Sequence, residues 1–367
     1  MTMVRAAVTE ATGTPFVLRE LELGELRPDE VLVKVAASGI CHTDLICRDQ
    51  WIPVPLPAVL GHEGAGVVER VGALVTKVAP GDRVGMTFDS CGSCRTCRIG
   101  KPSYCHAFFE HNFASARSDG STALSSDGAA IHTHFFGQSS FATHSVAHER
   151  NVVPLDPAIS LEIAAPFGCG IQTGAGAVLN SLAAPAGSTL VVLGTGTVGL
   201  AAVMAGVIAG CTTIIGVDLV PARLELALEL GATDVIDPRE FDLVETIRRL
   251  TRGGSDFCVE TTGSPAVLRQ GVDSLAPMGA CGVVGAPAFG SEVSLDVNWI
   301  LSAGRVVRGV VEGDSVPDVF LPQLVTLWQQ GRFPVERLMR FYDFDEIEQA
   351  AHDAEAGLTI KPVLRMS

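Results

Sequence analysis

The chain has 367 residues, of which 47% are hydrophobic and 18% are charged, and its formal net charge at neutral pH is −15. This length suits two domains, and the hydrophobic content predicts packed cores rather than disorder. The acidic balance argues against nucleic acid and anionic membrane surfaces as partners, because both attract clustered Lys and Arg. The longest apolar run, Val198 to Ala209, is too short to span a bilayer, and the N-terminal residues show no secretory pattern, so we expect a cytoplasmic protein.

The first 150 residues contain short β-like runs separated by Gly, Pro and Asp, for example at residues 31–35, 66–71 and 82–85. This pattern predicts an irregular, β-rich domain. Residues 118–130 are rich in Ser, Asp, Gly and Ala, which predicts an exposed loop.

From about residue 188 the pattern changes to alternating strands and helices. The continuous apolar strand at residues 189–193 is typical of a buried parallel sheet. The elements expected after it are a helix at 198–209, a strand at 213–218, a helix at 221–230 capped by Gly231, and strands at 256–260 and 282–285. From about residue 312 the tail carries an amphipathic helix at 316–330 and a β-like segment at 360–364.

A glycine-rich turn, Gly194-x-Gly196-x-x-Gly199, connects the strand at 189–193 to the next helix. Its glycines allow a tight turn, and the N–H groups that begin the helix favour a pyrophosphate. Asp218 ends the following strand, 19 residues after Gly199. There it is placed to accept hydrogen bonds from ribose hydroxyls and to repel a 2′-phosphate, so the pattern favours NAD over NADP.

Four cysteines, Cys91, Cys94, Cys97 and Cys105, share one short segment with the spacing C-x2-C-x2-C-x7-C. Four thiolates can close a tetrahedral zinc site that has no vacant position, which predicts a structural role. An iron–sulfur cluster is the alternative, but the bacterial cluster motif has three residues before its last cysteine rather than seven.

Cys41, His62 and Cys169 remain as candidates for a second, open metal site. A lone Cys or His is more often a packing residue than a ligand, and these three residues are far apart in the chain. Their spacing therefore cannot show that they meet. Six further histidines lack ligand spacing and are interpreted as incidental: His106, His111, His132, His134, His144 and His148.

At these residues the chain resembles the zinc-dependent alcohol dehydrogenases of the medium-chain dehydrogenase/reductase superfamily. The motifs that carry the resemblance span nearly the whole chain: Gly61-His62-Glu63-x-x-Gly66, the four-cysteine segment, Gly168-Cys169-Gly170, the glycine turn and Ile360-Lys361-Pro362-Val363. It implies an α/β protein with two domains. A β-rich, GroES-like catalytic domain would comprise residues 1–170 and 312–367, and a doubly wound, parallel-sheet Rossmann domain would comprise residues 171–311.

The resemblance also implies roles for individual residues. Cys41, His62 and Cys169 would bind a catalytic zinc and leave one position for water or substrate oxygen. Asp44 would orient His62, Glu63 would lie close to the metal, and Thr43 would bond the substrate alcohol and pass its proton on. The implied cofactor contacts are His42 and Lys361 at the pyrophosphate, Arg223 beside the adenosine ribose, and Thr173 and Val198 at the nicotinamide.

One position departs from the pattern. Many relatives have a histidine of a proton relay where this chain has Ile46, so the proton must leave by another route. The benzyl- and aryl-alcohol branch resembles the chain here and also shares the run from Phe135 to Ala142. We therefore expect aromatic or allylic primary alcohols as substrates. Ile46, Trp51, Phe88 and Phe141 are candidate walls of an apolar pocket, although each could equally be a core residue.

These inferences predict an enzyme that transfers hydride reversibly from a primary alcohol to NAD, with two zinc ions per subunit. Its partner would be a small-molecule alcohol or aldehyde, and the resemblance implies a homodimer or homotetramer. Two alternatives stay open. One is the S-(hydroxymethyl)glutathione (formaldehyde) dehydrogenase branch of the same superfamily, and the other is a non-catalytic redox sensor that binds zinc and nucleotide.

Overall fold

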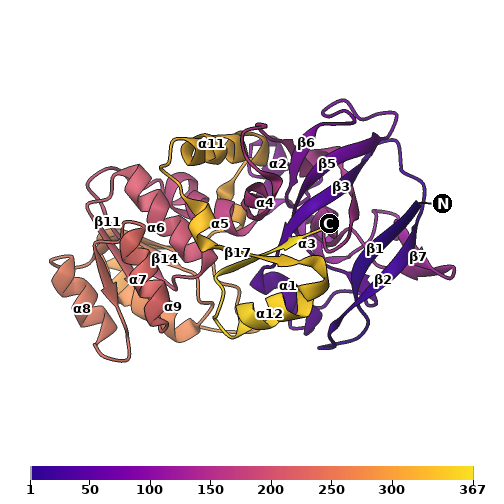
Figure 1. The fold of residues 1–367 in the computed structure, drawn as a ribbon. Coiled ribbons are helices and arrows are strands. Elements are labelled where there is room, and N and C mark those ends of the chain that lie inside the picture. Colours follow the sequence, from indigo (N-terminus) through magenta and orange to yellow (C-terminus); the bar gives the residue numbers. More distant parts are fainter. Residues whose placement is uncertain (1, 367) are drawn as a thin grey trace. The chain divides into compact units, whose positions relative to one another are not determined.

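The computed structural model describes residues 2–366, which divide into two compact units (Figure 1). Unit 1 contains the residues up to Cys169 together with those from Val316 onward, and unit 2 is Gly170–Ser315. The sequence placed the first boundary one residue later and the second four residues earlier. Residues 312–315 belong to unit 2, where Glu312 accepts hydrogen bonds from Gln172 Nε2 at 3.2 Å and Thr173 Oγ1 at 3.3 Å.

Unit 1 contains a five-stranded sheet in the order β4-β1-β2-β7-β8. Its strands are β1 (Thr2–Thr9), β2 (Phe16–Leu23), β4 (Ala58–Val59), β7 (Leu124–Ser126) and β8 (Ala129–Ile131). The prediction of an exposed loop over residues 118–130 was therefore wrong in part, because β7 and β8 form an antiparallel hairpin there. Asp127 and Gly128 turn the hairpin with φ values of 50° and 78°, so these small and polar residues are turn residues of a sheet.

A seven-stranded sheet in unit 1 positions the candidate metal ligands. Six of its strands follow the order β10-β6-β5-β3-β18-β17, and β9 also pairs with β3. The strands are β3 (Glu30–Gly39), β5 (Glu63–Val71), β6 (Arg83–Met86), β9 (His144–His148), β10 (Val152–Pro154), β17 (Met339–Asp343) and β18 (Lys361–Arg365). In the register, Gly39 is the partner of both Glu63 and Val363. The end of β3 and the starts of β5 and β18 therefore meet, which brings three distant segments of the chain together.

The helices of unit 1 are α1 (His42–Arg48), α2 (Arg95–Arg98), α3 (Phe108–Phe113), α4 (Leu161–Ala164), α11 (Pro317–Gln329) and α12 (Ile347–Glu355). The helix α1 begins at His42 because the Asp44 carboxylate accepts a hydrogen bond from the backbone N–H of Cys41 at 2.9 Å. Within residues 2–366, no helix is both long and apolar enough to cross a membrane.

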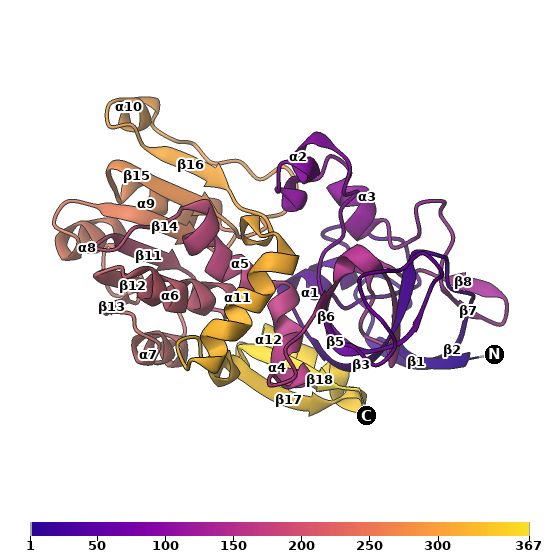
Figure 2. The same cartoon turned by 90° about the horizontal axis from the view of Figure 1, so that it is seen from above.

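Unit 2 is built on one parallel sheet in the order β13-β12-β11-β14-β15-β16, whose strands can be followed in Figure 2. They are β11 (Thr189–Leu193), β12 (Thr213–Val217), β13 (Asp234–Ile236), β14 (Ser255–Glu260), β15 (Leu275–Val283) and β16 (Val306–Gly309). The helices are α5 (Gly170–Gly176), α6 (Thr197–Ala209), α7 (Pro221–Glu229), α8 (Leu243–Leu250), α9 (Pro265–Asp273) and α10 (Val297–Leu301). The strand order reverses direction at β11, so right-handed crossovers cover both faces of the sheet. The predicted fold class, a β-rich domain joined to a doubly wound parallel-sheet domain, is confirmed.

A buried ion pair fixes the start of β3. Arg117 donates from Nε and Nη2 to the two carboxylate oxygens of Glu30 at 2.6 and 2.7 Å, and Glu30 is 5% exposed. Burial alone would raise the pKa of Glu30, but His134, whose Nε2 lies 3.6 Å from Oε1, and the hydrogen bonds from Arg117 outweigh it and lower the pKa to about 2. The pair therefore stabilises the fold above the ordinary carboxyl pKa, and this contribution is lost as the pH falls towards 2.

We expect Glu30→Gln to lower the free energy of unfolding by about 2 kcal/mol at pH 7, after allowance for solvent screening. Urea unfolding of both proteins checks this value. The difference between them should shrink as the pH falls below about 4.5, where the wild-type carboxylate begins to lose its advantage. A difference that stays constant down to low pH would contradict the assigned role of the charge.

Candidate active site

Three predicted ligands from different parts of unit 1 converge. The ligand atoms of Cys41, His62 and Cys169 all lie within 4.8 Å of one another, and His62 Nε2 is 3.2 Å from Cys169 Sγ. The sheet register brings Cys41 and His62 together, because Cys41 follows Gly39, His62 precedes Glu63, and Gly39 pairs with Glu63. Cys169 reaches the same place because the preceding residue, Gly168, packs tightly against β6. A Cβ on Gly168 would lie 1.9 Å from the Met86 carbonyl oxygen. Two thiols and one imidazole form a donor set that suits zinc.

Asp44 orients the imidazole. His62 Nδ1 lies 2.7 Å from Asp44 Oδ1, and both side chains are fully buried. The carboxylate accepts a hydrogen bond from Nδ1–H, so the Nε2 atom faces the two sulfur atoms. Burial opposes a charged imidazole, but the Asp44 carboxylate outweighs it and raises the pKa of His62. The hydrogen bond from Cys169 lowers the pKa of Cys41 well below that of a free thiol, which favours a thiolate ligand.

Two phenylalanine rings pack against the imidazole ring of His62. The Phe136 ring stacks on the imidazole with centroids 4.5 Å apart, and Phe135 meets it edge-on at 5.6 Å. Sequence reasoning noted this part of the chain only as a resemblance to a branch of the superfamily and missed the contact. The aromatic pair at residues 135 and 136 was the available signal, but the sequence alone cannot say which buried group the rings meet.

Glu63 and Lys361 form a buried ion pair next to this cluster. Lys361 Nζ donates to Glu63 Oε2 at 2.7 Å and to the Ile40 carbonyl oxygen at 3.0 Å, and the two residues are 0% and 2% exposed. Burial raises the pKa of Glu63, while Lys361 opposes this effect. The resemblance implied a pyrophosphate contact for Lys361, whereas here its ammonium group is engaged by Glu63.

The remaining predicted residues of unit 1 differ in their surroundings. His42 is exposed at the start of α1, and the Thr43 hydroxyl lies 3.8 Å from Cys41 Sγ. Of the candidate pocket walls, Ile46 and Phe88 are buried, and Trp51 is 64% exposed. Phe141 is fully buried against Phe16, with ring centroids 5.6 Å apart, so it contributes to the core of unit 1. The pocket assignments stay predictions.

The four-cysteine segment forms a second cluster, in which the sulfur atoms also lie within 4.8 Å of one another. Backbone N–H groups lower the pKa of Cys91 to about 7, and the Thr96 hydroxyl lowers that of Cys94 to about 5. These two thiols therefore favour the thiolate form that binds a metal, whereas burial raises the pKa of Cys97 and raises that of Cys105 to about 12.

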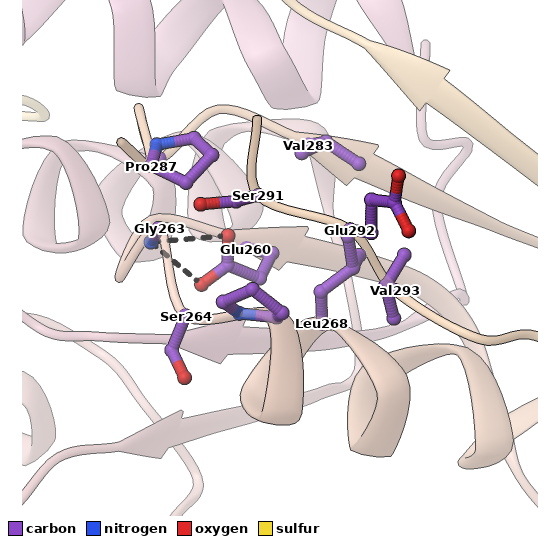
Figure 3. A pocket seen from close by; sticks show the side chains of 11 residues that line it. Glu260, Gly263, Ser264, Leu268, Val283, Pro287, Ser291, Glu292 and Val293 are labelled. Carbon is purple, nitrogen blue, oxygen red and sulfur yellow. Dashed lines mark hydrogen bonds between the residues drawn. The ribbon is translucent and has the colours of Figure 1, made fainter. Parts of the chain in front are cut away.

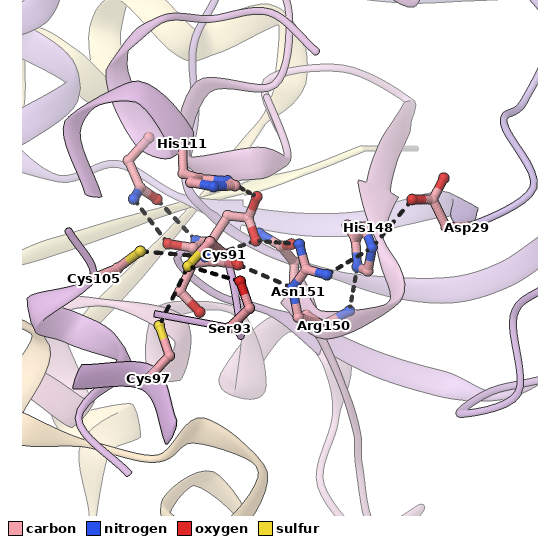
Figure 4. A network of polar contacts seen from close by, with 12 residues as sticks. Asp29, Cys91, Ser93, Cys97, Cys105, His111, His148, Arg150 and Asn151 are labelled. Atoms are coloured by element: carbon pink, nitrogen blue, oxygen red, sulfur yellow. Dashed lines mark hydrogen bonds and ion pairs between the residues drawn. The ribbon is translucent and has the colours of Figure 1, made fainter. Parts of the chain in front are cut away.

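A network of polar contacts supports the first turn of this segment (Figure 4). Asp89 lies 2.7 Å from His111 Nδ1, and Arg150 Nε donates to the Ser90 carbonyl oxygen at 3.0 Å. Arg150 also contacts His148, which lies 3.3 Å from Asp29. The network therefore ties the four-cysteine segment to the start of β3.

The glycine turn of unit 2 has the geometry that its sequence predicts. Gly194 has a φ of 90°, and a Cβ on Gly199 would lie 1.8 Å from the Gly194 carbonyl oxygen. A Cβ on Gly196 would meet nothing within 4 Å, so the backbone is open at the start of α6. Thr173 and Val198 lie on neighbouring helices, because a Cβ on Gly174 would lie 2.0 Å from the Val198 carbonyl oxygen. This arrangement suits a dinucleotide pyrophosphate at the N-terminus of α6.

Asp218 stands at the end of β12, where the chain itself supplies several donors to its carboxylate. Thr195 donates from its backbone N–H at 2.7 Å and from its hydroxyl at 3.1 Å, and Val220 N–H donates at 2.9 Å. Arg223 Nη1 lies 3.9 Å away. Sequence reasoning missed Thr195, which ties Asp218 to the glycine turn and fixes the direction of its carboxylate.

A separate cavity of about 60 Å³ opens in unit 2 at the carboxyl ends of β14 and β15 (Figure 3). Glu260 lies at its wall, and its carboxylate accepts hydrogen bonds from the backbone N–H groups of Thr262 and Gly263. The cavity is far smaller than the 300 Å³ or so of small-molecule sites, so it does not by itself define a substrate pocket.

Known proteins match the chain along almost its full length. The family model of the alcohol dehydrogenase GroES-like domain matches residues 27–157, and that of the zinc-binding dehydrogenases matches residues 197–327. A geraniol dehydrogenase of Castellaniella defragrans is 43% identical over 362 residues, which cover 98% of this chain and 97% of that protein. The chain belongs to the zinc-dependent alcohol dehydrogenases of the medium-chain dehydrogenase/reductase superfamily.

Two solved structures of such dehydrogenases are also similar to it. The crystal structure of an alcohol dehydrogenase zinc-binding domain protein from Burkholderia ambifaria is 54% identical, with a TM-score of 0.98 over 100% of this chain and 99% of that one. Benzyl alcohol dehydrogenase from Acinetobacter calcoaceticus is 48% identical, with a TM-score of 0.97 over the whole of both chains.

Proposed function

We propose that this alcohol dehydrogenase oxidises aromatic and allylic primary alcohols to aldehydes with NAD, and that it binds two zinc ions per chain. The observation that carries the proposal is the convergence of Cys41, His62 and Cys169 on one point beside Thr43. A three-ligand site leaves one position of a tetrahedral ion open for the substrate, whereas the four-cysteine cluster leaves none.

The chain's own residues prepare this chemistry. Asp44 holds the proton of His62 on Nδ1, so the imidazole presents Nε2 to the metal in one fixed orientation. The Thr43 hydroxyl accepts a hydrogen bond from the substrate alcohol, and as it takes up the alcohol proton it passes its own proton on towards solvent. Zinc, when bound, supplies the Lewis acidity that makes this proton acidic near neutral pH, and the nicotinamide accepts the hydride.

Two features support NAD as the cofactor. The open backbone at Gly196 admits a pyrophosphate, and the Asp218 carboxylate stands at the end of β12, where ribose hydroxyls are recognised. A carboxylate there repels the extra phosphate of NADP. Arg223 lies 3.9 Å from Asp218, and a guanidinium there could bind the 2′-phosphate of NADP. NADP should therefore be tested alongside NAD.

The substrate class rests on the relatives and on Ile46. One relative is a geraniol dehydrogenase and another a benzyl alcohol dehydrogenase, and both alcohols carry the hydroxyl next to an unsaturated carbon. Such a carbon stabilises the positive charge that develops as hydride leaves. The buried, apolar Ile46 is compatible with a hydrophobic substrate.

A substrate panel read by the absorbance of the reduced cofactor tests the proposal. Benzyl alcohol and geraniol should have kcat/KM values at least about tenfold above those of cyclohexylmethanol, the saturated control of similar size, and NAD should be preferred to NADP. A preference for S-(hydroxymethyl)glutathione would instead assign the enzyme to the formaldehyde branch. No turnover of any alcohol by zinc-loaded protein would favour the non-catalytic alternative.

A further inference from the structure

Four residues, Gln138–Phe141, run alongside the segment that carries His62. Ser139 Oγ donates to the Val59 carbonyl oxygen at 2.6 Å, Phe141 N donates to that of Leu60 at 3.0 Å, and Ser140 N donates to that of Gly61 at 2.8 Å. We call Gln138–Phe141 the strap. It follows the backbone of the metal-ligand segment residue by residue and ends at Gln138, next to His62.

Gln138 continues this pairing with its side chain instead of its backbone. Its Nε2 donates to the His62 carbonyl oxygen at 2.9 Å, and its Oε1 accepts from the Gly64 backbone N–H at 3.0 Å. The carboxamide thus takes the place that a neighbouring strand would occupy, and it holds the backbone on both sides of Glu63. At 1% exposed, Gln138 has no water to compete for these bonds.

The same carboxamide also reaches the second segment of the metal site. Gln138 Nε2 lies 3.3 Å from the Thr87 carbonyl oxygen, and the Thr87 hydroxyl donates to the Gly168 carbonyl oxygen at 2.8 Å. Gly168 directly precedes Cys169. One buried side chain therefore connects the backbone of His62 with the backbone that presents Cys169.

Tight packing around Gly64 and Phe136 restricts movement of the strap relative to the metal-ligand segment. A Cβ on Gly64 would lie 2.3 Å from Met86 Cε and 2.6 Å from Ser140 Cβ, so the strap and β6 close around that glycine. Phe136, two residues before the strap, has a left-handed φ of 50° and still stacks on His62. A phenylalanine keeps such a conformation only when its surroundings fix it, and Gln138 anchors the chain just beyond it.

We propose that Gln138 is a positioning residue of the catalytic metal centre, which sets the spacing between His62 and Cys169 through its bonds to His62, Gly64 and Thr87. The inference rests on the proposed function of the three-ligand site. The alternative is that Gln138 only provides hydrogen bonds to buried backbone groups and so contributes to the stability of the core. A core role predicts a general loss of stability, whereas a positioning role predicts a selective change at one of the two metals.

Gln138→Leu tests this difference, because leucine has a similar size and lacks all three hydrogen bonds. In zinc-loaded protein we expect zinc to leave the three-ligand site for a chelator at least about tenfold faster than in wild type, while the four-cysteine zinc is retained. After substitution with cobalt, the visible absorption bands of that site should shift. Tyr342→Phe is the matched control, since it removes a buried hydroxyl that donates to Asp353 at 2.7 Å in the same unit. The control should leave both readouts unchanged.

If Gln138→Leu does not fold, Gln138→Glu keeps the shape and the acceptor for Gly64 but turns a second oxygen towards two carbonyl groups. It should also speed zinc release. Wild-type release rates and an unchanged cobalt spectrum in a folded variant would overturn the inference. A wild-type protein that binds only one zinc, in the four-cysteine cluster, would instead overturn the proposed function, so the two failures can be told apart.

Discussion

Cys41→Ser should reduce kcat/KM for benzyl alcohol at least about a thousandfold, because it removes a ligand from a metal that contributes several kcal/mol to catalysis. The zinc content should fall from two ions to one per chain, since the serine hydroxyl does not ionise near neutral pH and the remaining pair, His62 and Cys169, binds weakly. The four-cysteine zinc should remain, because none of its ligands changes. Steady-state kinetics and elemental analysis of the same samples check both results.

Cys47→Ala is the matched control for this experiment. Cys47 lies on α1, the helix that follows Cys41, and it is fully buried. Burial raises the pKa of its thiol well above the ordinary value, so Cys47 is a packing residue without thiolate character. The control should retain both zinc ions and most of the activity. If Cys41→Ser kept two zinc ions and near-native turnover, the three-ligand site would not be the catalytic centre.

The second large effect concerns the buried pair of Glu63 and Lys361. Lys361→Met removes the ammonium group that forms an ion pair with the fully buried Glu63 carboxylate. Removing one partner of such a pair costs about 3–5 kcal/mol of unfolding free energy. The pKa of Glu63 should rise further, because Lys361 now lowers it. The stability of the variant should therefore fall as the pH rises through that pKa.

Urea unfolding over a pH series that rises from the ordinary carboxyl pKa measures this effect, with Glu63→Gln/Lys361→Met as the control. The double variant should recover most of the lost stability and should lose this pH dependence, because neither residue of the pair then carries a charge. The resemblance to other dehydrogenases implies a different role for Lys361, at the cofactor pyrophosphate. A variant with native stability but a raised KM for NAD would favour that role over the ion pair with Glu63.

What the sequence could predict follows from how local each feature is. The glycine turn and the four-cysteine cluster are each contiguous, so spacing alone indicated their geometry. Cys41, His62 and Cys169 meet only because Gly39 pairs with Glu63 and because Gly168 packs closely on Met86. Neither contact is visible in residue spacing. The expectation that the three ligands meet therefore depended on the resemblance to a known family.

The contacts that individual side chains make could not be predicted from the sequence. Gln138 and Phe136 contact the His62 segment. This part of the chain has left-handed backbone conformations at Phe136 and Ser139, which no local sequence motif predicts. The position of the second domain boundary was missed for a similar reason. Glu312 has a φ of 49° and is held by Gln172 and Thr173, contacts that join residues about 140 positions apart.

The central claim is that three residues distant in sequence share one metal ion, and anomalous diffraction from crystals of the zinc-loaded protein tests it most directly. Data on either side of the zinc absorption edge should show two peaks per chain, one among the four cysteines and one bonded to Cys41 Sγ, His62 Nε2 and Cys169 Sγ. A single peak at the four cysteines, with the other three side chains metal-free, would contradict the account.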